Sequence, residues 1–317
     1  MRDLHRADIL LKHACGLQPH VLTPGPPGSG QATTTSDAAM IVPCTFRIMV
    51  PAARPGPVVM LLIGGGTYRT AEGSDMPKPT IVLVHGAWAD GSSWNAVSTE
   101  LQGQGFTVLT PPNLLHGVAG DAAYVASFLA QRTTGPVVLV GHSYGGVVIT
   151  NAGTAGGDVK ALVYVDAFIP DVGENTFQIL GGSGSALDVP DPTAVLDIIG
   201  YPGAPEGDAE AFLKPSTVHD AFAQDLPEAD RWLIVASQRP ITLGANTAPT
   251  ETTAWKTIPS WTVVGTEDRV IPPATQRSMA ERAGSTITEI AASHVSMVSH
   301  PAAAIDAILA AVAAIDD

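Results

Sequence analysis

From Thr80 onward, short apolar runs rich in β-branched residues alternate with segments of helical pattern. The expected strands are Thr80–Val84, Phe106–Thr110, Pro136–Val140, Lys160–Val165, Trp261–Val264 and Thr286–Ile290. The expected helices are Ser92–Gln104, Asp121–Arg132, Tyr144–Ala155, Pro273–Ala283 and Pro301–Ile315. Strands that are apolar along their length and alternate with helices indicate a mostly parallel sheet covered by helices on both faces. We therefore predict an α/β fold.

The alternation stops between about Phe168 and Thr257, in a stretch rich in Pro, Gly and acidic residues. Helical patterns return there only near Thr193–Ile199 and Glu228–Ala236. Open α/β sheets bind ligands at the carboxyl ends of their strands. We therefore expect this stretch to be an insertion that covers that edge.

The first 75 residues differ in kind from the rest. They carry a net charge of +1 and include the breaker cluster Pro24–Gly30, whereas residues 76–317 carry −15. A short helix near Ala7–Ala14 and a strand near Val58–Ile63 are the only elements expected there. We interpret residues 1–75 as an N-terminal extension, flexible or an artefact of an upstream start codon, and residues 76–317 as the folded domain.

The charge of the whole chain limits its partners. With 16 basic and 30 acidic residues its formal charge is −14, so phosphate backbones and anionic lipids are poor partners. We expect neither nucleic acid nor a membrane as partner, since no apolar stretch is long enough to span a bilayer. Cys15 and Cys44 lie in the extension, which leaves the domain without thiolate metal ligands or disulfides. The N-terminus lacks a secretory pattern, which favours a cytoplasmic location. The oligomeric state is not readable.

The strongest chemical signal is Gly141-His142-Ser143-Tyr144-Gly145-Gly146, directly after an expected strand and before an expected helix. This is a Gly-x-Ser-x-Gly turn in the strand–turn–helix setting that exposes a serine hydroxyl at the top of a sheet. The alternative is a glycine-rich turn with an incidental serine. We predict that Ser143 is a nucleophile.

A serine hydroxyl needs an adjacent base, which a carboxylate orients. Among the nine histidines, His294 follows the last expected strand and is our candidate base; for His85 and His142, which belong to turns, a backbone or packing role is expected. Asp268 follows the strand Trp261–Val264 and is the favoured acid, with Asp166 at the end of Lys160–Val165 as a competitor. The resulting order Ser, Asp, His is the order found on this type of sheet.

His85-Gly86-Ala87-Trp88 follows the first expected strand. Acyl transfer develops an oxyanion, and on such a scaffold this loop supplies one backbone donor while the residue after the nucleophile supplies the other. The amides of Ala87 and Tyr144 are the predicted donors.

Together these elements resemble the α/β-hydrolase superfamily over about Pro77–Ile315. The runs Ile81–Trp88 and Val163–Pro170 look like those of a bacterial esterase group akin to plant methyl-salicylate-type esterases and hydroxynitrile lyases. The resemblance implies an α/β-hydrolase fold with a small helical cap at about Phe168–Thr257. It also implies a Ser–His–Asp mechanism with no metal and no organic cofactor.

Two departures separate this chain from other members of the superfamily. Dehalogenases and epoxide hydrolases of this fold use an aspartate nucleophile, where this chain has Ser143. Plant hydroxynitrile lyases carry a lysine directly after the base and a threonine after the histidine of the oxyanion loop, where this chain has Val295 and Gly86. Both departures favour hydrolysis over lyase chemistry.

The sequence thus predicts a serine esterase that acts on a small, fairly apolar ester. A lyase or C–C-bond-cleaving enzyme on the same triad, and a low-turnover small-molecule sensor, stay open as alternatives, because one fold hosts many functions. Candidate substrate-binding residues are Trp88, Phe168, Tyr201 and Trp232, each of which has a core role as its alternative.

Overall fold

Six strands of the chain pair in parallel in the order β2-β1-β3-β4-β8-β9. The computed structural model describes residues 78–316. The strands are β1 (Thr80–Val84), β2 (Val108–Leu109), β3 (Pro136–His142), β4 (Asp158–Val165), β8 (Ser260–Gly265) and β9 (Thr286–Ile290). The six expected strands are confirmed, although β2 is shorter than Phe106–Thr110.

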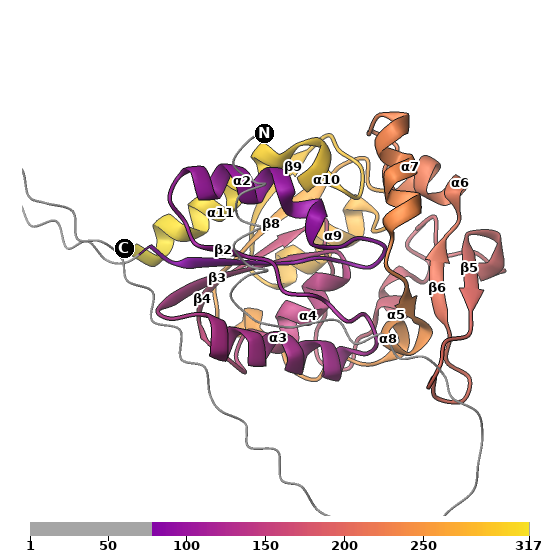
Figure 1. The fold of residues 1–317 in the computed structure, drawn as a ribbon, viewed down its shortest axis with the longest axis horizontal. Coiled ribbons are helices and arrows are strands. Elements are labelled where there is room, and N and C mark those ends of the chain that lie inside the picture. The colour runs from indigo at the N-terminus through magenta and orange to yellow at the C-terminus, as the bar shows by residue number, and fades with distance from the viewer. Residues whose placement is uncertain (1–77, 317) are drawn as a thin grey trace, which may run out of the picture. The chain divides into compact units, whose positions relative to one another are not determined.

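Helices cover both faces of this sheet, as predicted. Figure 1 shows α2 (Asn95–Gly103) and α11 (Pro301–Asp316) on one face and α3 (Val118–Arg132) and α4 (Tyr144–Ala152) on the other. Between β8 and β9 lies α9 (Pro273–Arg282), and the single turn α10 (Ser296–Ser299) precedes α11. The helix expected over Ser92–Gln104 begins instead as a 3₁₀ turn, η1 (Gly91–Trp94), in which the Asp90 side chain accepts from the Ser92 amide.

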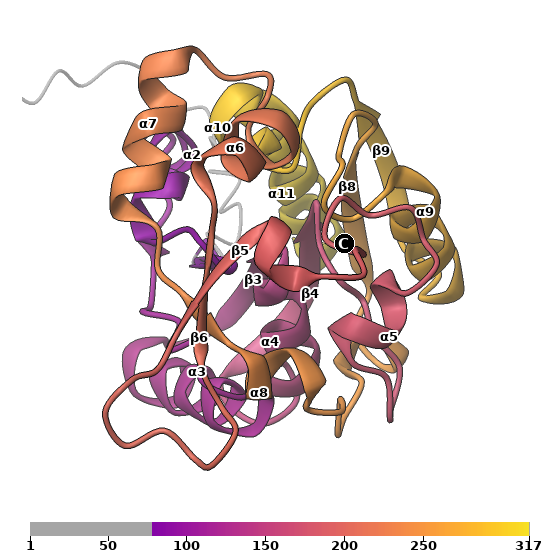
Figure 2. The ribbon, with the colours of Figure 1, turned by 90° about the vertical axis from the view of Figure 1, so that its right-hand side faces the viewer.

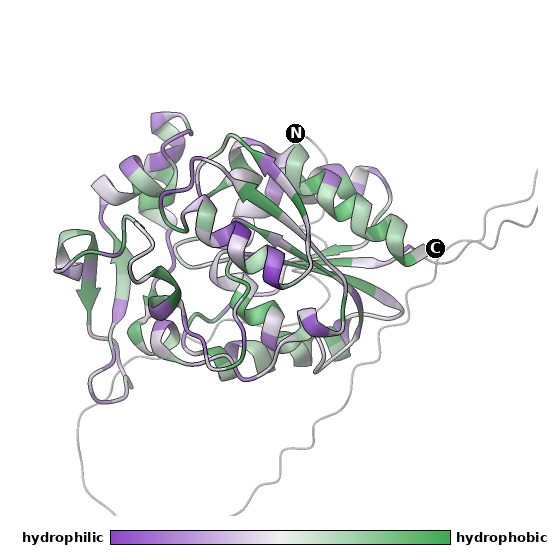
Figure 3. Ribbon diagram, turned by 180° about the vertical axis from the view of Figure 1, so that it is seen from behind, coloured by the Kyte–Doolittle hydropathy of each residue, from purple (hydrophilic) through white to green (hydrophobic). Residues whose placement is uncertain are grey.

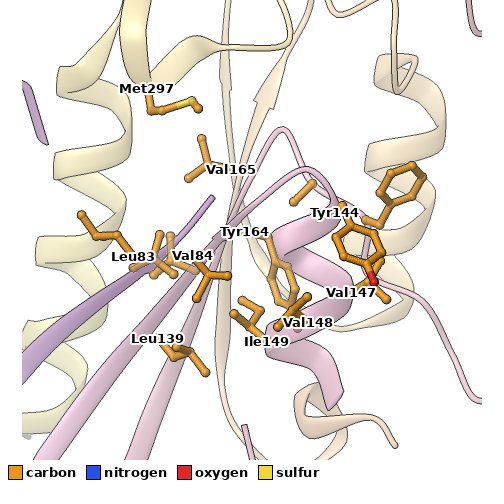
Figure 4. Packing of buried hydrophobic residues seen from close by; sticks show 14 of the residues in the cluster. Leu83, Val84, Leu139, Tyr144, Val147, Val148, Ile149, Tyr164, Val165 and Met297 are labelled. Atoms are coloured by element: carbon orange, nitrogen blue, oxygen red, sulfur yellow. The ribbon is translucent and has the colours of Figure 1, made fainter. Parts of the chain in front are cut away.

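The core lies between the sheet and these helices. All five residues of β1 are buried, and Leu83, Leu139 and Ile149 are among the fully buried side chains. Figure 4 shows strand residues of the sheet packed against the apolar side of α4. In Figure 3 the strands are largely hydrophobic, whereas hydrophilic residues gather on the outer turns of the helices. Burying apolar surface on both faces fixes the sheet in the middle layer.

The insertion between β4 and β8 is a cap at the carboxyl edge of the sheet (Figure 2). Its strands β5 (Leu196–Ile199), β6 (Glu210–Leu213) and β7 (Ile241–Thr242) form a small antiparallel sheet. Its helices are α5 (Thr176–Leu180), α6 (Pro215–Thr217), α7 (Glu228–Ser237) and α8 (Leu243–Thr247), with the short helical turns η2 (Pro192–Ala194), η3 (Val218–Phe222) and η4 (Ala254–Lys256).

The prediction of a helix over Thr193–Ile199 is wrong, whereas α7 confirms the one over Glu228–Ala236. Only η2 is helical there, and Leu196–Ile199 pairs with β6 from Leu196↔Leu213 to Ile199↔Glu210. The β-branched residues Ile198 and Ile199 suit a pleated strand, and a partner strand distant in sequence decides the outcome.

The elements expected at Ala7–Ala14 and Val58–Ile63 lie outside the described residues. Among residues 78–316, no helix has the length and apolar character needed to cross a membrane.

Candidate active site

Ser143 lies in a tight turn between β3 and α4. Its φ of 52° falls in the left-handed region, which is strained for a residue with a side chain and typical of a nucleophile turn. The turn can form because its neighbours are glycines: a Cβ on Gly145 would lie 2.5 Å from the Val84 carbonyl oxygen of β1. The sequence therefore places the serine where β1 and β3 adjoin, at the carboxyl edge of the sheet.

The three residues predicted as a triad come together in the structure. Ser143 Oγ lies 2.8 Å from His294 Nε2, and His294 Nδ1 lies 2.7 Å from Asp268 Oδ2. Because the carboxylate accepts, Nδ1 carries a proton and Nε2 is left to accept the Ser143 hydroxyl. The side chains of His294 and Asp268 are fully buried and Ser143 is 2% exposed, so bulk water does not compete for these bonds.

Asp268 is held by the chain around it. Its Oδ1 accepts hydrogen bonds from the amides of Val270 and Ile271, at 2.7 and 2.9 Å. Its Oδ2 accepts a 2.7 Å hydrogen bond from the Gln276 side chain on α9 as well as the one from His294. These four donors fix the carboxylate and satisfy a buried charge.

Asp166, the competing acid, does not hydrogen-bond to His294. Its two oxygens accept from the amides of Gly265 and Ser296, both at 2.9 Å. Complete burial, reinforced by the nearby Asp268 charge, raises the pKa of Asp166 to about 7. Its hydrogen bonds therefore join two loops at the ends of strands.

The loop after β1 is held by His85 and Asn113. His85 Nδ1 donates to the Gly86 carbonyl at 2.9 Å, because its Nε2 accepts the Asn113 amide at 3.1 Å. The Asn113 side chain donates to the His85 carbonyl at 2.9 Å. Burial lowers the pKa of His85, which favours this neutral form. Its expected backbone role fits these contacts.

The predicted oxyanion donors flank the nucleophile. The Gly86–Ala87 peptide is trans, so the Ala87 N–H points away from the Gly86 carbonyl that His85 holds. Among the described residues, no backbone carbonyl accepts from the Ala87 amide. Tyr144 is the first residue of α4, where amides lack partners within the helix. Both donors are available for a ligand.

His142 contacts the backbone and the ring of the base, His294. Its Nε2 donates to the His294 carbonyl at 2.8 Å, and the two rings lie 5.0 Å apart. Burial keeps the pKa of His142 well below its ordinary value, so the ring is neutral beside the base. This matches the packing role expected for it.

Of the four predicted substrate-binding residues, only Trp88 lines a pocket beside His294. Phe168 does not line it; its backbone amide donates to the Ser143 carbonyl at 3.3 Å. Tyr201 instead packs on His116 and donates to Asp208, and Trp232 is half exposed against His219. Neither lines that pocket.

Sequence reasoning missed Asn113, Gln276 and Phe222. Gln276 lies on α9 eight residues after the acid, and Asn113 lies in the loop after β2, so only the fold brings them to the site. Phe222, whose ring lies 5.2 Å from that of His294, comes from η3, a part of the cap for which the sequence predicted no element.

The arrangement can activate a serine and stabilise a developing oxyanion. Within residues 78–316, no group of three His, Cys, Asp or Glu side chains is placed to hold a metal ion. The residues present are those of nucleophilic acyl transfer.

Comparison with curated proteins finds relatives that carry hydrolase names. The carbendazim hydrolyzing esterase of Nocardioides sp. is 35% identical over 114 residues, 31% of this chain and 46% of that protein. The pyrethroid hydrolase of Sphingobium wenxiniae is 28% identical over 252 residues, 71% of this chain and 85% of that protein. The chain thus spans about half the length of the first relative and most of the second.

Solved structures agree on the fold. The crystal structure of polyneuridine aldehyde esterase matches with a TM-score of 0.63 and 20% identity, over 76% of this chain and all of that one. The plant-esterase likeness expected from Ile81–Trp88 and Val163–Pro170 is confirmed at the level of the fold. Residues 81–307 match the model of one family, which covers most of the chain and all of the site loops, and the chain therefore belongs to the alpha/beta hydrolase family.

Proposed function

We propose that this chain is a serine esterase that hydrolyses a small, fairly apolar carboxylic ester. The observation that carries the proposal is the continuous hydrogen-bonded chain from Ser143 Oγ through His294 to Asp268, at 2.8 and 2.7 Å. The names of the relatives, an esterase and a hydrolase, support the same activity class.

In the proposed cycle, Ser143 Oγ attacks the ester carbonyl carbon while its proton passes to His294 Nε2. The amides of Ala87 and Tyr144 stabilise the oxyanion, and Asp268 holds the imidazolium that forms. His294 then returns the proton to the leaving alcohol oxygen, and an acyl-enzyme remains. Water repeats the sequence on the acyl-enzyme, which releases the carboxylic acid and restores Ser143.

Labelling with a fluorophosphonate tests the nucleophile without a guessed substrate. We expect a single adduct on Ser143 in native protein, found by intact mass and peptide mapping, and none after heat denaturation. Ser143→Ala should fold, resist labelling and lose ester turnover. Undiminished hydrolysis by that variant would contradict the proposal.

Two alternatives have distinct readouts. Formation of an aldehyde or ketone without a carboxylate would indicate lyase chemistry, which Val295 and Gly86 disfavour. Saturable binding of small molecules without any product would indicate a sensor.

We further propose that catalysis resides in residues 76–317 and that residues 1–75 are an extension. The family match over residues 81–307 supports this division. A chain that starts at Met76 should keep the kcat and KM of the full chain, and a large loss would assign the extension a part in catalysis.

A further inference from the structure

A cavity of about 190 Å³ lies beside the site, between the cap and the loop after β1. Its apolar lining comes from that loop, from η3 and the residues after it, from α7 and from the α10 region; α7 and α10 are labelled in Figure 2. The larger apolar lining residues are Trp88, Phe222, Leu226, Leu233, Ile234, Val295 and Val298. No triad residue lines it, so a wall of side chains separates the cavity from Ser143 and His294.

Two aromatic side chains form this wall. The Phe222 ring lies 5.2 Å from the His294 imidazole and meets the Trp88 ring edge-on, with centroids 6.1 Å apart. Phe222 and Trp88 also line the cavity, and Val295 directly follows the base. The cavity therefore lies on the His294 side of the site.

Phe222 and Trp88 both lie in backbone conformations of unfavourable energy. Phe222 ends a π-helical turn, η3, and Trp88 has a φ of 58°. Such segments occur most often at functional sites, and they are retained when surrounding contacts over-determine them. Here the cap supplies those contacts: the Trp88 amide donates to the Arg239 carbonyl and its indole N–H to the Ala211 carbonyl, both at 2.9 Å.

In an esterase, the position of the cavity beside His294 indicates which part of the ester it receives. In ester cleavage the leaving oxygen must take its proton from His294 Nε2, so the alcohol part of the ester points toward the base. We propose that this cavity receives the alcohol part of the substrate once Phe222 or Trp88 moves aside. The inference rests on the proposed esterase function and specifies its leaving group.

The cavity also restricts the chemistry of that alcohol. An apolar cavity of about 150 Å³ holds one benzene molecule. The volume of this pocket, about 190 Å³, therefore admits an alcohol with a single aromatic ring or a short alkyl chain, and its lining also includes the polar side chains of Ser92, Ser93 and Ser237. The carboxylates of Asp90 and Asp230 lie in the lining and disfavour an anion. The leaving alcohol is therefore neutral and apolar.

Calorimetric titration of full-length Ser143→Ala protein with benzyl alcohol tests the cavity without turnover. We expect saturable one-to-one binding, and no binding of the matched anion 4-(hydroxymethyl)benzoate. Adding Ile234→Trp, which fills the cavity from α7, should weaken benzyl alcohol binding at least tenfold. The matched control Ala236→Trp lies exposed on the same helix outside the lining and should leave binding unchanged.

Reversing the charge of one lining residue tests the cavity with a gain of binding, which a misfolded variant would not show. Asp230 is exposed, so Asp230→Lys should fold, and it should give 4-(hydroxymethyl)benzoate measurable affinity. In enzyme with an intact Ser143, Ile234→Trp should lower the ratio of kcat/KM for benzyl acetate to that for methyl acetate at least tenfold. The cavity proposal would be overturned if this kcat/KM ratio were unchanged and if neither Ile234→Trp nor Asp230→Lys altered binding. Formation of the Ser143 adduct would then still support the esterase function. Loss of the adduct with benzyl alcohol binding intact would instead reject the esterase function.

Discussion

The Tyr144 hydroxyl donates a 2.9 Å hydrogen bond to Oδ2 of Asp121, and both side chains are buried. The same carboxylate accepts the amides of His116 and Gly117, each at 3.3 Å. Burial raises the pKa of Asp121, because it disfavours the charged form of the carboxyl. The residue that follows the nucleophile is thus tied through its side chain to the start of α3.

Tyr144→Phe should lower the free energy of unfolding by about 1–3 kcal/mol, because a buried carboxylate loses a donor. It should leave kcat nearly intact, since the proposed oxyanion donor is the backbone amide of Tyr144. Urea unfolding and ester turnover measure the two effects. Tyr124→Phe, an exposed tyrosine of α3, is the control and should change neither. A large fall in kcat would assign the hydroxyl a part in the reaction.

Asp268→Asn should lower kcat by about 10⁴-fold, because an amide in place of the carboxylate favours the wrong tautomer of His294. Asp166→Asn should cost far less, since Asp166 accepts only from the amides of Gly265 and Ser296. Steady-state kinetics on both folded variants decide between the two acids. The reverse order of effects would assign the triad acid to Asp166.

Asp166 should make stability depend on pH. Its pKa is 3.8 ordinarily and about 7 when folded, so the folded state favours the protonated carboxyl. Its contribution to stability is therefore fully present below pH 3.8 and is lost as pH rises through about 7. The unfolding free energy of Asp166→Asn, relative to the unsubstituted protein, should rise from pH 4 to 7 in urea titrations. A difference that stays constant over this range would contradict the assignment.

The sheet was predictable because its strands are apolar along their length and each is bounded by turns. β1 and β9 have the predicted ends, and the other strands deviate by one or two residues at a boundary. Local pattern failed at Leu196–Ile199, where β6 supplies the partner across a long loop. No local signal reports that pairing.

The proposed triad was predictable for a different reason: Ser143, Asp268 and His294 each follow a strand, and parallel strands bring their carboxyl ends to one edge. The choice between Asp166 and Asp268 needed distances, since both follow strands. The position of Phe222 and the cavity behind it could not be predicted from the sequence, because they depend on how an irregular cap packs on the loop after β1.

The last prediction concerns the oxyanion loop, where Gly86 adjoins the nucleophile. A Cβ on Gly86 would lie 2.6 Å from Ser143 Cβ and 2.8 Å from the His142 carbonyl oxygen, so Gly86→Ala must displace the loop. Loss of the Ala87 donor should then cost about 2.7–4 kcal/mol of transition-state stabilisation, a fall in kcat of about 10²–10³-fold. Gly103→Ala in α2 is the control: it meets no atom within 4 Å and should raise stability by about 0.5–1 kcal/mol at unchanged kcat. Near-normal turnover by folded Gly86→Ala would place the oxyanion donor elsewhere.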